Sequence, residues 1–149
     1  MEEIEARWKR LQEHLSSCQR CRDRCAPPLI DAISLPLFGR FRPWPDGVLF
    51  VLEAPNRDDT INPTKRYLTV EPDTDPSGRF THQLLTEELG LDPAAFQVTN
   101  AVLCLPSGSG GKYPVRPSQM RECSSNLQQT IAVLQPMVVA PLGSVALSA

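Results

Sequence analysis

The sequence predicts an α/β fold, a three-layer sandwich in which helices cover both faces of a central parallel sheet. The chain has 149 residues, of which 41% are apolar, enough for one core. Its apolar segments follow the order strand, helix, strand, helix, strand from residue 47 onward, which is typical of parallel strands joined by right-handed crossovers. We therefore expect residues 1–149 to form a single domain.

An amphipathic helix is expected first. Over residues 2–16 the apolar side chains recur at helical spacing, as Ile4, Trp8, Leu11 and Leu15. Pro27 and Pro28 prevent a helix from continuing beyond the cysteine-rich segment that follows. Residues 29–45 are irregular and contain several prolines, so we expect a loop there.

Three apolar segments predict the strands. Residues 47–52 are continuously apolar, which suits a central strand covered on both faces, and residues 96–103 and 136–142 predict the other two. A long polar loop to residue 77 follows the first strand. The predicted helices begin near Ser77, near Pro117 and at Gly143, and the second has an apolar face of Met120, Cys123, Leu127, Ile131 and Leu134.

Ligands of open parallel sheets bind beyond the carboxyl ends of the strands. The polar segments Glu53–Asp59 and Asn100–Cys104 lie at or just past two of these ends. We expect the two segments to share one crevice.

The charge balance excludes a strong overall attraction to polyanions. There are 15 basic and 17 acidic side chains, a net charge of -2, so any contact with nucleic acid must come from a local patch. The N-terminal third is locally basic and is the candidate for phosphate contacts, through Arg7, Lys9, Arg10, Arg20, Arg22, Arg24, Arg40 and Arg42. The sequence shows neither a signal peptide nor a long apolar segment, and we expect a cytoplasmic protein that does not enter membranes.

Five cysteines, an odd number in an apparently reducing compartment, favour metal binding over disulfides. Cys18 and Cys21 have the spacing of a local ligand pair, and Cys104 and Cys123 would complete a four-thiolate shell for an iron-sulfur cluster or zinc. Burial of Cys104 and Cys123 as small apolar side chains, and a redox pair, are the alternatives. Cys25 is then the spare thiol.

Six segments together resemble the uracil-DNA glycosylase superfamily, in particular its iron-sulfur branch, family 4. In that branch an N-terminal C-x-x-C precedes the motifs G-E-x-P-G-x-x-E, A-G-x-x-L, T-N-x-x-K-C-x-P, E-x-x-x-C and L-G-x-x-A. The matching segments here are Cys18–Cys21, Leu52–Asp59, Ser77–Thr81, Thr99–Pro106, Gln119–Cys123 and Leu142–Ala146. Their order is that of the family.

The resemblance implies roles for particular residues. Hydrolysis of an N-glycosidic bond needs a carboxylate that orients water and groups that hold the departing base. By resemblance, Asp59 would orient the water, with Glu53 and Asp58 as lesser candidates, and Asn100 would bind the uracil edge. The resemblance implies two further substrate contacts. One is Asn56, in the segment that matches G-E-x-P-G-x-x-E. The other is a residue that stacks on the flipped base, which would be Tyr67 or Leu68.

The chain departs from the family at several positions. Leu52 and Asn56 stand where the family has glycine, and Asp59 replaces its glutamate. The family's later His-Pro-Ser motif is absent, and neither His14 nor His82 matches it. We expect the chain to be incomplete at its C-terminus; natural loss of the motif is the alternative.

These features leave three classes of function open. The first is a monomeric glycosylase of the iron-sulfur type that excises uracil or another deaminated base from DNA. A second is a catalytically impaired, glycosylase-like module that binds DNA or a nucleobase. A third is a structural domain stabilised by zinc.

Overall fold

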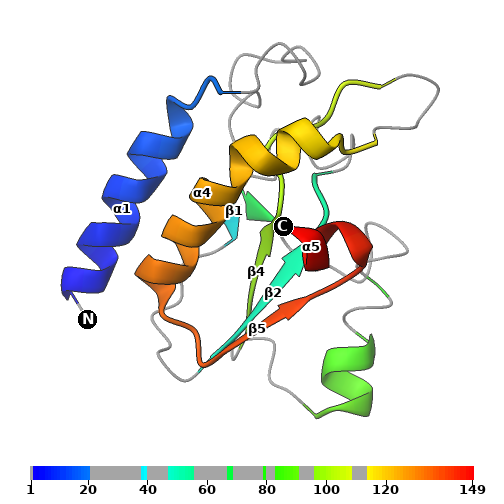
Figure 1. Cartoon of the computed structure of the whole chain (residues 1–149). Coiled ribbons are helices and arrows are strands. Elements are labelled where there is room, and N and C mark those ends of the chain that lie inside the picture. The colour runs from blue at the N-terminus through cyan, green and yellow to red at the C-terminus, as the bar shows by residue number, and fades with distance from the viewer. Residues whose placement is uncertain are drawn as a thin grey trace.

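The computed structural model describes residues 2–20, 38–39, 47–55, 67–68, 79, 83–90, 96–108 and 114–149. Its main sheet has three strands, β2 (Val48–Leu52), β4 (Phe96–Asn100) and β5 (Val138–Pro141), in the order β4-β2-β5. All pairs are parallel, as expected, and β2 is central (Figure 1).

The crossovers explain why the sheet is the middle of three layers. From the central strand β2 the chain moves to β4 at one edge of the sheet. It then crosses past β2 to β5 at the opposite edge. Two right-handed crossovers in opposite directions place their connections on opposite faces of the sheet. The predicted three-layer α/β class is therefore confirmed, with α4 (Pro117–Leu134) as the second connection.

The largest core cluster joins β2 to the helices. Leu49 and Val51 point to one face of the sheet and pack with side chains of α1 (Glu2–Ser16), α4 and α5 (Ser144–Ser148). Phe50, between them in sequence, belongs to the opposite face and is also buried. Both faces of β2 are thus covered, which explains its continuous apolar sequence.

The two long helices match the prediction. α1 buries Trp8, Leu11 and Leu15 in the main core and lies alongside α4 (Figure 1). α4 begins at Pro117, where proline at the first helical position loses no hydrogen bond. It ends at Leu134, where Gln135 adopts the left-handed conformation.

Other elements differ from expectation. Within the two predicted loops the structure places a small parallel pair of strands, β1 (Phe38–Gly39) and β3 (Tyr67–Leu68). The described part of the helix expected after Ser77 is a π-helical segment, η2 (Gln83–Glu88), and its predicted apolar residues Leu84 and Leu89 are exposed. Leu89 donates its backbone N–H to the carbonyl of Leu84, five residues earlier, so the regular α-helical spacing is lost.

We expect Leu15→Ala to destabilise the fold by about 2–5 kcal/mol, because a fully buried leucine is replaced by a smaller side chain and a cavity. Denaturant unfolding measures this loss. Leu147→Ala is the matched control, since Leu147 is 75% exposed, and its free energy of unfolding should change by less than about 0.5 kcal/mol. Equal effects at the two positions would contradict the packing of α1 described above.

None of the described helices combines the length and apolar character that crossing a bilayer demands.

Candidate active site

The carboxyl ends of the three strands meet at one edge of the sheet. Beyond the register of β2 and β4, Ala101 donates its backbone N–H to the Leu52 carbonyl at 2.8 Å, and Val102 donates to the Glu53 carbonyl at 3.0 Å. On the other side of β2, Leu142 donates to the Val51 carbonyl at 2.8 Å. The segments after β2 and β4 therefore start side by side at this edge, and the crevice expected between them stays a prediction.

Asn100 is the last residue of β4, and its side chain is only 1% exposed. Neither its Oδ1 nor its Nδ2 has a hydrogen-bond partner among the described residues. A buried polar group without a partner costs about 1–3 kcal/mol, so unpaired amides are rare inside proteins. This side chain offers one free acceptor and one free donor at the strand end where a ligand is expected.

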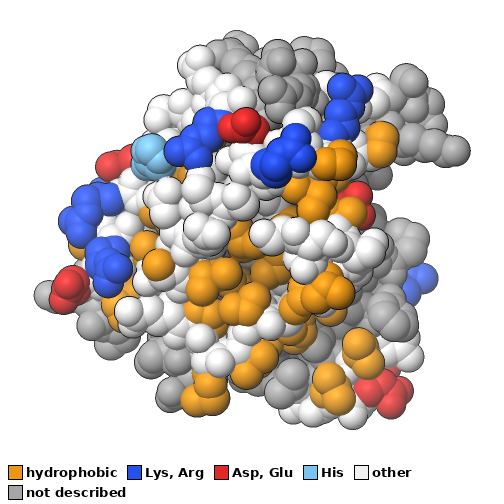
Figure 2. Space-filling model, in the orientation of Figure 1, with side chains coloured by type: hydrophobic (Ala, Val, Ile, Leu, Met, Phe, Trp, Pro, Cys, Tyr) orange, Lys and Arg blue, Asp and Glu red, His pale blue; other side chains and the backbone are white. Residues whose placement is uncertain are grey.

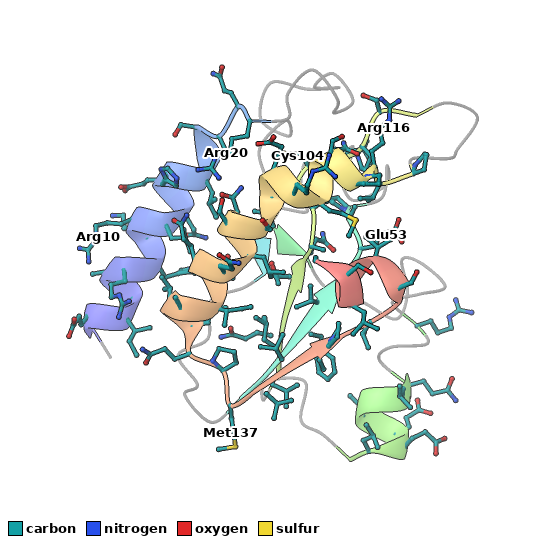
Figure 3. All side chains as sticks on the ribbon, viewed as in Figure 1. Arg10, Arg20, Glu53, Cys104, Arg116 and Met137 are labelled. Carbon is teal, nitrogen blue, oxygen red and sulfur yellow. The ribbon has the colours of Figure 1, made fainter. Side chains whose placement is uncertain are left out.

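Glu53 is the described carboxylate of the predicted catalytic set. It follows β2 directly, and its side chain is exposed at the same edge of the sheet (Figure 3). The hydrogen bond from Val102 to its carbonyl brings it close to the Asn100–Val102 segment. The other predicted residues of this motif, Asn56, Asp58 and Asp59, lie outside the described residues.

The candidate stacking residues, Tyr67 and Leu68, form strand β3, whose backbone pairs with β1. Their side chains are outside the described part of the structure. Their position relative to Asn100 therefore remains a prediction.

The start of α4 is attached to this same edge. A second apolar cluster joins buried Val102 and Cys123 with Ala54, Val115 and Met120. Ala54 follows β2, Val102 follows β4, and the other three belong to α4 or the residue pair before it. The N-terminal turns of α4 are thus fixed next to the segments that leave the two strands.

The segment that follows α1 contacts the middle of α4. The amide Nδ2 of Asn126 lies 3.8 Å from the sulfur of Cys18, and Arg20 donates a hydrogen bond from its guanidinium to the Ser125 hydroxyl. Asn126 is buried, and its Oδ1 has no partner among the described residues. Cys18 therefore contacts α4 at a position three residues after Cys123, which is about one helical turn along the helix.

The predicted metal ligands are described in part. Cys18 and Cys104 are half-buried, Cys123 is buried, and none of them forms a disulfide within the described part. Across the described ranges, no three His, Cys, Asp or Glu side chains are grouped as a metal ion requires, so these three thiols do not form a ligand shell as placed. Cys21, the fourth predicted ligand, and Cys25 lie outside the described residues.

A surface hollow of about 440 Å³ lies between α4 and α5. Neither Asn100 nor Glu53 lines it. Its polar lining comes from the exposed side of α4, with Arg121, Ser124 and Gln128, and from Ser148 of α5.

Gly143 connects β5 to α5 at the edge where the strands end. Its φ of 94° belongs to the region that residues with a Cβ rarely adopt, although nothing lies within 4 Å of a Cβ added there. Glycine is therefore required by the backbone of this turn and not by lack of space. This explains the glycine of the segment Leu142–Ala146.

Sequence reasoning missed several side chains near this edge. Arg116 and Arg121 on the start of α4, and Ser125 and Asn126 where α1 ends against α4, were not singled out. Only Asn126 had a usable signal, because it lies three residues after Cys123 and hence on the same, buried side of α4. The arginines could not be recognised from the sequence, because their position near the strand ends depends on how α4 packs in the fold.

Comparison with known proteins agrees with this architecture. No curated protein matches the chain. The family model of the uracil DNA glycosylase superfamily matches residues 38–149, which include all three strands of the main sheet, α4 and α5. α1 and Cys18 lie outside the matched segment. The match covers most of the chain, and the protein belongs to the uracil DNA glycosylase superfamily.

Proposed function

We propose that this protein hydrolyses the N-glycosidic bond of uracil, or of a related deaminated base, in DNA. The observation that carries the proposal is the amide of Asn100, which is buried at the carboxyl end of β4 and has no hydrogen-bond partner among the described residues. Uracil presents a donor at N3–H and an acceptor at O4, and the free Oδ1 and Nδ2 match these two groups. Cytosine presents the reverse pattern on the same edge, so the amide would distinguish the two bases.

The base must leave the DNA stack to reach this side chain. Because Asn100 is almost fully buried, the crevice must also open to admit it. The bound base forms hydrogen bonds with both groups of the amide. The free energy that the fold loses by burying this amide without a described partner is therefore regained when the base binds.

The chemistry assigned to the site is a displacement at the sugar. The bond between C1′ and the base nitrogen breaks, the base departs with the electron pair, and water adds its oxygen to C1′. One carboxylate orients the water and accepts one of its protons. The uracil anion takes a proton from the solvent to become neutral, and the carboxylate returns its own proton to the solvent. We assign the water to Asp59, with Glu53 and Asp58 as the lesser candidates.

Two further contacts with the substrate are proposed: Asn56 binds it, and Tyr67 or Leu68 stacks on the extruded base. A 4Fe-4S cluster, with zinc as the alternative, is proposed to bind to Cys18, Cys21, Cys104 and Cys123. The cluster would place the protein in the iron-sulfur branch. Support comes from the contact of Cys18 with Asn126, beside the helical turn that carries Cys123.

A module that binds without excising is the alternative function. Leu52 and Asn100 are register partners in the parallel pair, so their side chains leave the sheet on the same face. Leucine at this position, where the related motif has glycine, leaves less room beside the amide. Excision and binding must therefore be measured separately.

The test uses an end-labelled oligonucleotide that contains one uracil. We expect the wild-type protein to produce an alkali-labile site at the uracil, and no cleavage when cytosine occupies that position. Asp59→Asn should lower the excision rate by about 100- to 10,000-fold, and Glu53→Gln and Asp58→Asn by clearly smaller factors. Binding without any alkali-labile site would favour the non-excising module and contradict the enzyme.

A further inference from the structure

Basic side chains follow the edge of the molecule that carries the strand ends, although the chain as a whole has a net charge of -2. Figure 2 shows blue side chains in a row across its upper part, with an acidic group among them. Arg20 and Arg116, labelled in Figure 3, lie along this edge together with Cys104. The exposed arginines here are Arg20, Arg116 and Arg121, which we call the α4 arginines.

Contacts within the fold fix the order of the three along α4. Arg116 precedes the first residue of α4, next to Val115, which packs in the cluster with Ala54 and Val102. Arg121 lies five residues further along, about 1.4 helical turns after Arg116. The guanidinium of Arg20 is hydrogen bonded to Ser125, and positions 121 and 125 are neighbours on the helix surface.

The three groups therefore follow one another over the first turns of α4. Positions 116 to 125 span about 13 Å along a helix axis at 1.5 Å per residue. One strand of B-DNA has a phosphate about every 3.4 Å of duplex axis, so this length corresponds to about four phosphates. Glu122 is the acidic residue within this segment of α4, and with it the group has a net charge of +2 from three arginines and one glutamate.

We propose that the α4 arginines bind the phosphate backbone of the DNA next to the extruded nucleotide. This inference rests on the proposed function, because it takes DNA as the substrate and the edge with Asn100 as the place where the base enters. Val102, two residues after Asn100, packs against the start of α4, so the first turns of α4 lie near the strand end where the base is proposed to enter. The phosphate contacts then come from α4 and the segment that follows α1, and not from the basic residues of α1 itself.

The test measures the salt dependence of binding to a uracil-free oligonucleotide, which needs no excision. Each phosphate contact contributes about 0.9 to the slope of log K against log salt on duplex DNA. We expect the triple variant Arg20→Gln, Arg116→Gln, Arg121→Gln to lower that slope by about 2.7. The matched control is Arg7→Gln, Lys9→Gln, Arg10→Gln, which removes the same charge from α1, where Arg10 lies away from the edge (Figure 3).

An unchanged slope in the triple variant of the α4 arginines, or equal decreases in both triple variants, would overturn the proposal. Thermal unfolding checks that both variants are folded. If the first is not, Arg121→Gln alone serves, with an expected decrease in slope of about 0.9. If the triple variant lowers the slope as expected but the wild-type protein releases no uracil, the proposed function is refuted and the phosphate-binding surface stands. If the wild-type protein releases uracil but the slope does not depend on these arginines, the function stands and the surface is refuted.

Discussion

Asn100→Ala is expected to lower uracil excision by about 100- to 1,000-fold without destabilising the protein. The rate falls because the variant loses both groups that match the uracil edge. Stability is retained because the amide makes no hydrogen bond to any described residue, so its removal takes away a buried unpaired group. Relief of that group offsets the lost packing, and we expect the free energy of unfolding to stay within about 1 kcal/mol of wild type.

Thr99→Val is the matched control for this variant. Thr99 is also buried in β4, but it is the neighbouring residue, so its side chain leaves the sheet on the opposite face. Its excision rate should remain within a few-fold of wild type. Single-turnover excision and denaturant unfolding are measured on both variants. A large loss of stability in Asn100→Ala, or equal activity of Asn100→Ala and wild type, would contradict the assigned role.

Cys104→Ser is expected to abolish metal binding. If Cys104 is one of four thiolate ligands, replacing it leaves a shell of three, and the purified variant should contain much less iron or zinc per chain than wild type. Elemental analysis measures the metal, and visible absorption distinguishes a cluster from colourless zinc. Because metal binding and folding are coupled, the variant should also unfold at lower temperature.

Cys25→Ser is the control, since Cys25 is the cysteine not assigned as a ligand. It should retain the metal and the thermal stability of wild type. Metal-free wild-type protein, or equal loss of metal in both variants, would contradict the four-cysteine site. The first result would instead support burial of Cys104 and Cys123 as small apolar side chains.

The main elements could be predicted because their patterns depend on one buried face. Trp8, Leu11 and Leu15 recur at helical spacing, and all three are buried where α1 meets α4. The continuous apolar sequence of β2 matches its position between two covered faces. The spacing of apolar residues reflects which side of a helix or strand is buried. It therefore identifies these elements even when the elements that pack against them are unknown.

The short elements could not be predicted for the opposite reason. β1 and β3 contain two residues each, too few for any period to show, and they exist only because they pair with each other. In η2, apolar spacing suggested a regular helix with a buried side, but Leu84 and Leu89 are exposed. Tertiary contacts outweigh local preference in segments of this length.

For the site, the parallel topology was enough to predict that the segments after β2 and β4 lie at the same edge of the sheet, and the hydrogen bond from Val102 to Glu53 joins their first residues. Chain direction alone fixes this result. The unpaired state of the Asn100 amide and the position of Arg116 depend on three-dimensional packing, so no sequence pattern indicates either of them.

The most direct measurement is NMR of the ¹⁵N-labelled protein during titration with free uracil. The side-chain NH₂ signals of Asn100, assigned by their loss in Asn100→Ala, report on the group proposed to bind the base. We expect these signals to shift and saturate with uracil and to remain in place with cytosine. No shift with uracil, or the same shift with both bases, would contradict the recognition of uracil by Asn100.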